Sequence, residues 1–238
     1  MENPFLTAEW KKLVLFNYKV EPEVLLPYLP YKTELDYWNN TCYVSLVGFM
    51  FLNTRLKGIR IPFHSDFEEV NLRFYVRYKD EITNEWKRGV VFIKEIVPKP
   101  ALTFVANTIY KEHYQTMSMK HSISSNHDGL SVEYAWKSKA WNSIKVLCQS
   151  ADESIQINSE AEFITEHFWG YTRIDDSKTS EYNVEHPRWN VYPVLDYSIE
   201  VDFADLYGEA FANLRHQKPV SVFVAEGSEI FVGAGKII

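Results

Sequence analysis

The sequence has few cysteines, no signal-peptide pattern in its first residues and no long apolar run. Its two cysteines, Cys42 and Cys148, form neither a CxxC pair nor a disulfide framework, which is typical of proteins from a reducing compartment. The first residues lack the basic and apolar stretches of a signal peptide, and no apolar run approaches the roughly 18 residues of a membrane-spanning helix. We therefore expect a cytoplasmic protein with no membrane partner.

Positive charge and ligand-binding motifs are also scarce. The chain carries 25 Lys and Arg residues against 32 Asp and Glu residues, a formal net charge of -7, so we expect no nucleic-acid partner. The 7 histidines include no HExxH, HxH or His/Cys spacing, which predicts that no metal is bound. The chain also lacks a GxSxG elbow and a glycine-rich phosphate loop, and we expect no cofactor.

What is present is an aromatic, strand-forming chain. Its 238 residues are 46% hydrophobic and 16% aromatic, and no linker-like stretch divides them, so we expect one domain over residues 1–238. Four short helices are expected, over 22–29, 100–110, 160–168 (opened by the Ser159 and Glu162 capping box and ended by Gly170) and 205–214. Strands are predicted over 13–20, 42–52, 69–78, 88–97, 114–122, 130–137, 144–149, 182–192, 220–225 and 230–233.

Many strands with few helices indicate a mostly β (α+β) fold. The strands are too closely spaced for a succession of strand–helix–strand units, and the Asp128-Gly129 pair predicts a hairpin between two of them. We expect a mostly antiparallel sheet system, closed into a barrel or folded as a sandwich, with a few peripheral helices.

The predicted strand over 69–78 alternates strictly between apolar and polar residues. Glu69, Asn71 and Arg73 share one face with two further polar residues, and Val70 and Leu72 begin the apolar face. A polar face that meets water is the common interpretation of such a strand. In a closed barrel the same face would line the interior, and an acid and a guanidinium would then share one cavity.

Two other features allow both a functional and a structural interpretation. Lys94 lies beside Glu95 in an apolar run, where a desolvated lysine could act as an amine nucleophile, or its stem could pack while its amine reaches water. The segments 166–173 (EHFWGYTR) and 185–191 (EHPRWNV) each place an acid–His pair near Trp and Arg. Such groups line small-ligand pockets, and they also pack at helix ends.

With these residues in view, the chain resembles the YqjF-like family of uncharacterised proteins, domain of unknown function 2071, within the acetoacetate-decarboxylase-like superfamily. The resemblance covers nearly the whole chain and implies a closed or nearly closed β-barrel with peripheral helices and a ligand cavity. It rests on the segments 25–30 (LLPYLP), 42–52 (CYVSLVGFMFL), 67–77 (FEEVNLRFYVR), 88–92 (RGVVF), 166–171 (EHFWGY) and 186–189 (HPRW).

The resemblance also bears on chemistry. Decarboxylases of the superfamily form a Schiff base through one lysine of a Gly-Phe-Pro-Lys-Lys stretch, and the second lysine lowers the pKa of the first. The corresponding stretch here looks like 110–115 (YKEHYQ), which places Tyr114 and Gln115 where the two lysines would be. Glu69 is similar to the acid on a Tyr-x-Glu strand of the superfamily, so the resemblance implies a site role for it.

Three functions remain open. In the first, the barrel cavity binds a small organic, carboxylate-bearing molecule through Glu69, Asn71, Arg73, Tyr114 and His121. In the second, the protein is an enzyme that acts on a small keto or carboxylic acid by a route other than the Lys-Lys Schiff base. In the third, the barrel is filled by side chains. The sequence leaves homo-oligomerisation open.

We predict that the protein does not decarboxylate acetoacetate, because Tyr114 and Gln115 have no amine to condense with a ketone. A tyrosine with its usual pKa of about 10 is no substitute nucleophile at neutral pH. Borohydride trapping in the presence of acetoacetate, followed by mass spectrometry, is expected to give no reduced adduct. An adduct on Lys94, Lys120 or another lysine, together with evolved carbon dioxide, would contradict this prediction.

Overall fold

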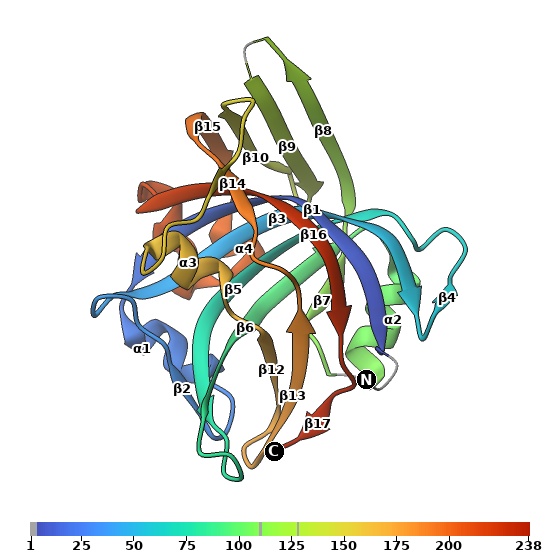
Figure 1. Ribbon diagram of the computed structural model, residues 1–238, viewed down its shortest axis with the longest axis vertical. Coiled ribbons are helices and arrows are strands. Elements are labelled where there is room, and N and C mark those ends of the chain that lie inside the picture. The colour runs from blue at the N-terminus through green and yellow to red at the C-terminus, as the bar shows by residue number, and fades with distance from the viewer. Residues whose placement is uncertain (1–3, 110, 128) are drawn as a thin grey trace.

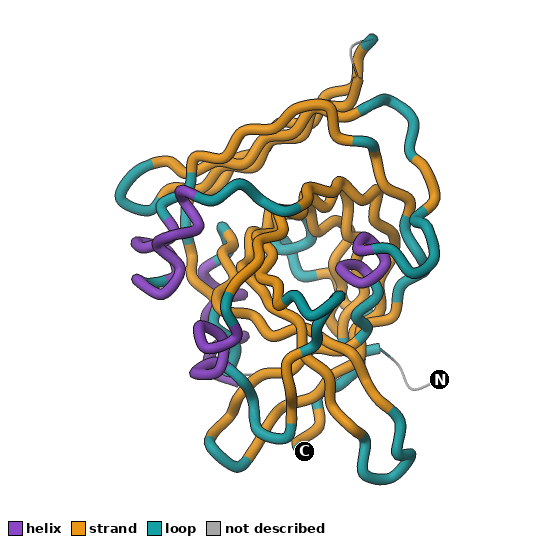
Figure 2. Tube along the Cα trace, turned by 90° about the vertical axis from the view of Figure 1, so that its left-hand side faces the viewer, coloured by secondary structure: helices purple, strands orange, loops and turns teal. Residues whose placement is uncertain are grey.

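The core of the structure is a nearly closed ring of strands. A computed structural model describes residues 4–109, 111–127 and 129–238. The ring closes where Val184 and Glu185 of β13 pair with Val232 and Phe231 of β16 (Figures 1 and 2). In order, its strands are β16 (Ser221–Val232), β1 (Leu6–Val20), β3 (Cys42–Leu56), β5 (Phe67–Lys79), β6 (Trp86–Val97), β12 (Trp169–Asp175) and β13 (Lys178–Glu185).

Short strands extend the edges of this ring. Most pairings are antiparallel, as expected, but β6 runs parallel both to β12 and to β7. The parallel pairing with β7 places Glu95 beside Tyr114, which the site depends on. The short strands are β2 (Thr33–Leu35), β4 (Ile59–Arg60), β7 (Tyr114–Thr116), β11 (Glu153–Ser154), β14 (Asn190–Tyr192) and β17 (Lys236–Ile237).

A second sheet covers the outer face of the ring. Its strands lie in the order β15 (Val194–Glu200), β10 (Trp141–Cys148), β9 (Gly129–Lys137) and β8 (Ser118–Asn126), and the β8–β9 hairpin projects at the top of Figure 1. The two sheets approach closely at Gly48 of β3. A Cβ atom there would lie 2.9 Å from the side chains of Tyr134 and Ile144, so a larger residue would push the sheets apart.

The helices are short and peripheral. They are α1 (Pro22–Leu25) with the 3-10 turn η1 (Leu26–Tyr28), α2 (Pro100–Ile109), α3 (Glu160–Thr165), and α4 (Phe203–Tyr207) with η2 (Glu209–His216). The Ser159 hydroxyl accepts a hydrogen bond from the Glu162 amide at 3.2 Å, which confirms the predicted cap of α3. Within the part of the chain described, no helix is long and apolar enough to cross a membrane.

Most predicted elements are confirmed, and the corrections have identifiable causes. The third helix ends at Thr165 instead of Phe168, and Gly170 lies inside strand β12, where a Cβ atom would be 2.2 Å from the Tyr182 ring. Strands β12 and β15 were not predicted, and the strand over 182–192 is two strands separated by residues 186–189. The predicted strands over 220–225 and 230–233 are one strand, β16. The β8–β9 hairpin is confirmed by its pairing, although Asp128 lies outside the described residues.

The alternation of β5 separates two cores. Val70, Leu72 and Phe74 are fully buried against the second sheet. The intervening side chains point into the ring, where a second apolar cluster contains Tyr75. The interpretation of a barrel interior is therefore correct for this strand, and the interpretation of a face open to water is not.

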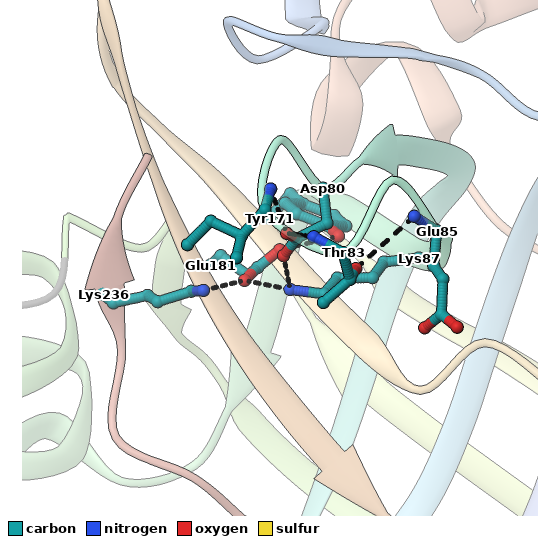
Figure 3. Close-up of polar contacts among 8 residues, drawn as sticks. Asp80, Thr83, Glu85, Lys87, Tyr171, Glu181 and Lys236 are labelled. Carbon is teal, nitrogen blue, oxygen red and sulfur yellow. Dashed lines mark hydrogen bonds and ion pairs between the residues drawn. The ribbon is translucent and has the colours of Figure 1, made fainter.

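A buried carboxylate holds the last described strand to the ring (Figure 3). Glu181 of β13 is 0% exposed, and its carboxylate lies 3.1 Å from Lys87 Nζ and 3.0 Å from Lys236 Nζ of β17. Tyr171 donates a hydrogen bond to it at 3.1 Å, and Lys87 also contacts Asp80 at 2.5 Å. A buried charge needs such partners, because its desolvation is otherwise uncompensated.

We predict unequal effects of removing the two lysines. Lys87→Met leaves Glu181 buried beside one half-exposed amine, and we expect the free energy of unfolding to fall by about 3 kcal/mol, the scale for breaking a buried pair. The Lys236 side chain is 56% exposed, so Lys236→Met is expected to cost at most about 1 kcal/mol. Urea denaturation at neutral pH measures both, and equal losses would contradict this account of the network.

Candidate functional site

The ring encloses a cavity of about 440 Å³. Its lining is mostly apolar and aromatic, because the inward faces of the strands carry rings at alternate positions. The aromatic residues that line it are Phe5, Trp10, Phe49, Phe51, Phe67, Phe92, Tyr114, Trp169, Tyr182 and Trp189. A small number of polar side chains interrupts this lining, and they gather on β5, β6, β7 and the segment before β7.

Three of the predicted site residues meet in the cavity as a hydrogen-bonded group. Glu69 and Asn71 project from β5 and are 2% and 1% exposed. Asn71 Nδ2 donates to Glu69 Oε1 at 2.9 Å, and the Tyr114 hydroxyl donates to Glu69 Oε2 at 3.3 Å. Both oxygens of Glu69 therefore have a donor, and neither donor is a cation.

Two further carboxyl groups lie beside this group, and the sequence analysis did not assign them to the site. Glu95 of β6 lies opposite Asn71 in the β5–β6 pairing and opposite Tyr114 in the β6–β7 pairing. Its Oε2 atom is buried without a hydrogen-bond partner among the described residues. Glu112 accepts a hydrogen bond from the Thr172 hydroxyl at 2.7 Å. We call Glu69, Glu95 and Glu112 the carboxyl cluster.

Burial keeps the carboxyl cluster partly protonated. Desolvation, with repulsion from Glu112, raises the pKa of Glu69 to about 7, although Asn71, Tyr114 and Arg73 act in the other direction. Desolvation also raises the pKa of Glu112 to about 7. The pKa of Glu95 is raised well above its usual value by desolvation and by repulsion from the other two carboxyls. Groups with such pKa values can both donate and accept protons near neutral pH.

Arg73 is a buried cation that contacts an aromatic ring but no anionic group among the described residues. It is 8% exposed and lines the cavity, but it makes no ion pair or hydrogen bond with any other described residue. Its guanidinium carbon lies 5.8 Å from the centre of the Tyr75 ring. Because a guanidinium carries five donors, such a position leaves a forked binding site for two oxygen atoms.

Two histidines complete the polar lining. His167 Nε2 lies 3.2 Å from Asp36, whose carboxylate also accepts from Arg88 Nε at 2.6 Å. Burial nevertheless lowers the pKa of His167 to about 4, so its ring is neutral near pH 7. The His186 ring stacks on Trp189 with centroids 4.0 Å apart. These residues lie in the two segments in which the sequence paired acid–His with Trp, so both segments contribute to the cavity lining, and His167 also packs against Phe163 of α3.

His121 is not part of this site. It lies on β8, and its Nδ1 atom is 2.6 Å from the carboxylate of Glu68, on the face of β5 opposite Glu69. Strand alternation explains the difference, since adjacent residues of one strand point to opposite faces. The structure thus brings together Glu69, Asn71, Arg73 and Tyr114, and it places His121 outside the cavity.

Lys94 also points away from the cavity. Its amine donates to the carbonyl oxygen of Leu206 in α4, beside the Tyr207 ring, and burial lowers its pKa. No lysine is among the described residues that line the cavity. Lys94 therefore lies outside the cavity, and a backbone carbonyl holds its amine.

The whole arrangement has relatives among solved structures. Acetoacetate decarboxylase from Legionella pneumophila matches 99% of this chain and 87% of its own length, with 14% identity and a TM-score of 0.65. An acetoacetate decarboxylase-like enzyme from Sphingomonas wittichii RW1 matches 100% and 94%, with 11% identity and a TM-score of 0.66. The enduracididine biosynthesis enzyme MppR, solved with pyruvate, matches 100% and 91%, with 11% identity and a TM-score of 0.66. The fold is therefore acetoacetate-decarboxylase-like.

Within this fold class, sequence comparison identifies the family. The model of the domain of unknown function 2071, described as an uncharacterised conserved protein, matches residues 7–229. The chain belongs to this family. A curated relative, the uncharacterised protein YqjF of Bacillus subtilis (strain 168), is 28% identical over 131 residues, which are 55% of this chain. The chain spans about half the length of this relative, since the match covers 50% of it.

We predict that the carboxyl cluster makes stability fall as the pH rises. A carboxyl whose pKa is about 7 when folded and about 4.5 when unfolded holds its proton longer in the folded state. Its stabilising effect is therefore complete below about pH 4.5 and is lost as the pH rises through 7. Glu112→Gln keeps an acceptor for Thr172. Its free energy of unfolding is expected to exceed that of the parent by about 2 kcal/mol at pH 8, and by less at pH 5.

The control for this prediction is Glu200→Gln, which changes an exposed carboxyl on β15. Denaturant titrations of the three proteins at pH 5, 6, 7 and 8 measure the effect. The same pH profile for the parent and Glu112→Gln would mean that Glu112 ionises normally.

Proposed function

We propose that the cavity binds a small organic molecule through its carboxylate, and that Arg73 is the carboxylate-binding residue. The observation that carries this proposal is the buried guanidinium, which faces a cavity and has no ion pair or hydrogen bond with any described residue. An ionised carboxylate satisfies two guanidinium donors at once in a fork. Glu69 forms no hydrogen bond or ion pair with Arg73 and accepts instead from Asn71 and Tyr114.

The size and lining of the cavity support a small ligand. Its volume of about 440 Å³ lies within the range of roughly 300–1,000 Å³ that is usual for small-molecule sites. The rings of Trp10, Trp169 and Trp189 offer flat apolar surfaces for the body of such a molecule. An open volume of this kind argues against a barrel that is merely filled by side chains.

A second candidate function is catalysis on a small keto or carboxylic acid without a lysine Schiff base. It is supported by the carboxyl cluster, because pKa values of about 7 for Glu69 and Glu112 suit a general acid or base. In this account Arg73 holds the substrate carboxylate, and Glu69, linked to the Tyr114 hydroxyl, moves the proton. The related fold of MppR was solved with pyruvate, a small keto acid of this class.

We propose that residues 1–238 act as one cytoplasmic domain. One apolar core joins the ring to the second sheet, which supports a single folding unit. Cys42 and Cys148 are both buried and unpaired, which suits a reducing compartment.

We predict that Arg73→Lys weakens the binding of small carboxylates. Lysine keeps the charge but loses the fork, so affinity should fall by about 1–3 kcal/mol, the scale of a charge-assisted hydrogen bond. Thermal-shift screening of small organic acids, followed by calorimetry on the hits, measures this. Native mass spectrometry of the freshly purified protein identifies any ligand that is retained.

The matched control is Arg77→Lys, four residues further along the same strand. Arg77 pairs with Glu34 at 2.6 Å and does not line the cavity, so this variant should keep the affinity of the parent. The same set of hits with the same affinities in the parent and in Arg73→Lys would remove Arg73 from the site.

A further inference from the structure

We infer that the ligand also carries a basic nitrogen, which the carboxyl cluster binds, so that the cavity takes a zwitterion such as an ω-amino acid. The inference rests on the proposed function of Arg73, which supplies the site for the other end of the molecule. Its own basis is the neighbouring part of the cavity lining, where the carboxyl cluster forms no ion pair with a described residue.

Few donors from outside the carboxyl cluster reach its oxygen atoms. The donors that contact it are Nδ2 of Asn71 and the hydroxyls of Tyr114 and Thr172. The single Tyr114 proton is shared, because Glu95 and Glu69 both interact with that hydroxyl. Glu95 is 3% exposed, and its Oε2 atom has no hydrogen-bond partner among the residues described. An ammonium group brings three donors, so it matches this deficit.

The charges around the carboxyl cluster also point to a missing cation. None of the three carboxyls forms an ion pair with a described Lys, Arg or His. The titratable groups that act on them from neighbouring elements are Arg73 of β5, Tyr114 of β7 and Tyr182 of β13. Arg73 is the sole cation of these, and a bound carboxylate would neutralise it. A cationic group on the ligand restores the balance.

The register of the strands sets the distance between the two ends of the ligand. Glu95 pairs with Asn71, and Arg73 is two residues further along β5, which is roughly 7 Å at the rise of a strand. A short aliphatic chain between an amine and a carboxylate spans a gap of this order. The aromatic rings that line the cavity suit the methylene groups between them.

A bound metal ion is a different way to supply positive charge. Among the described residues, no group of three or more His, Cys, Asp and Glu side chains has the arrangement that could hold one. An ammonium suits the carboxyl cluster better than a metal ion, because hydrogen bonding to an ammonium needs no tight coordination geometry.

Isothermal titration calorimetry with matched probes tests the inference. The probes are γ-aminobutyrate against butyrate, δ-aminovalerate against valerate, and butylamine, each titrated into the parent, Glu95→Gln, Arg73→Lys and the exposed-site control Glu229→Gln. We expect each amino acid to bind roughly tenfold or more tightly than its matched acid. Glu95→Gln should abolish this advantage without weakening the plain acids, and Glu229→Gln should change nothing.

Titration in two buffers of different ionisation enthalpy gives a second, variant-free measurement. Binding of an ammonium drives protons off the carboxyl cluster, so the amino acids should release protons at pH 7 and the plain acids should not. If the plain acids bind in an Arg73-dependent way and the amine adds neither affinity nor proton release, the inference is wrong and the proposed function stands. If no probe depends on Arg73, the proposed function fails, and the zwitterion inference fails with it.

Discussion

The two-residue period of β5 is the constraint on which the rest of the structure depends. One face of the strand supplies Val70, Leu72 and Phe74 to the core beneath the second sheet, and the other supplies Glu69 and Arg73 to the cavity. A shift of one residue in the pairing register of β5 would turn each of its side chains to the opposite face of the sheet. Charged side chains would then lie in the core and apolar ones in the cavity. The position of the polar site is therefore coupled to the packing of the two sheets.

This coupling explains why part of the site could be predicted from the sequence. Alternation identified Glu69, Asn71 and Arg73, because the period of a strand can be counted along the chain. Glu112 could not be found in this way, since it follows α2 and reaches the cavity only through the parallel pairing of β7 with β6. Gly170 was misread as a helix end, because the reason for the glycine is the Tyr182 ring of a neighbouring strand. Contacts between segments that are distant in sequence leave no local pattern.

The buried polar groups of the cavity lower the stability of the fold. Burying carboxyls without cations raises their pKa values and costs stability, and burying a guanidinium without an acceptor also costs stability. Joining Arg73 directly to Glu69 would have removed part of both costs. The strands hold them apart instead, with Asn71 and Tyr114 on Glu69. Local conflict of this kind is typical of functional sites in otherwise consistent structures.

The closure of the ring has a consequence for how the molecule forms. Strand β1 pairs with β16, and Leu6 lies opposite Val232, so the first strand of the ring meets a partner from the far end of the chain. Loop-closure entropy opposes such a contact until most of the other strands are in place. During synthesis, β1 must therefore wait beside β3 with one edge unpaired until the last strands leave the ribosome. The newly made chain is thus most exposed to aggregation late in synthesis, when most of the ring exists but its edge is still open.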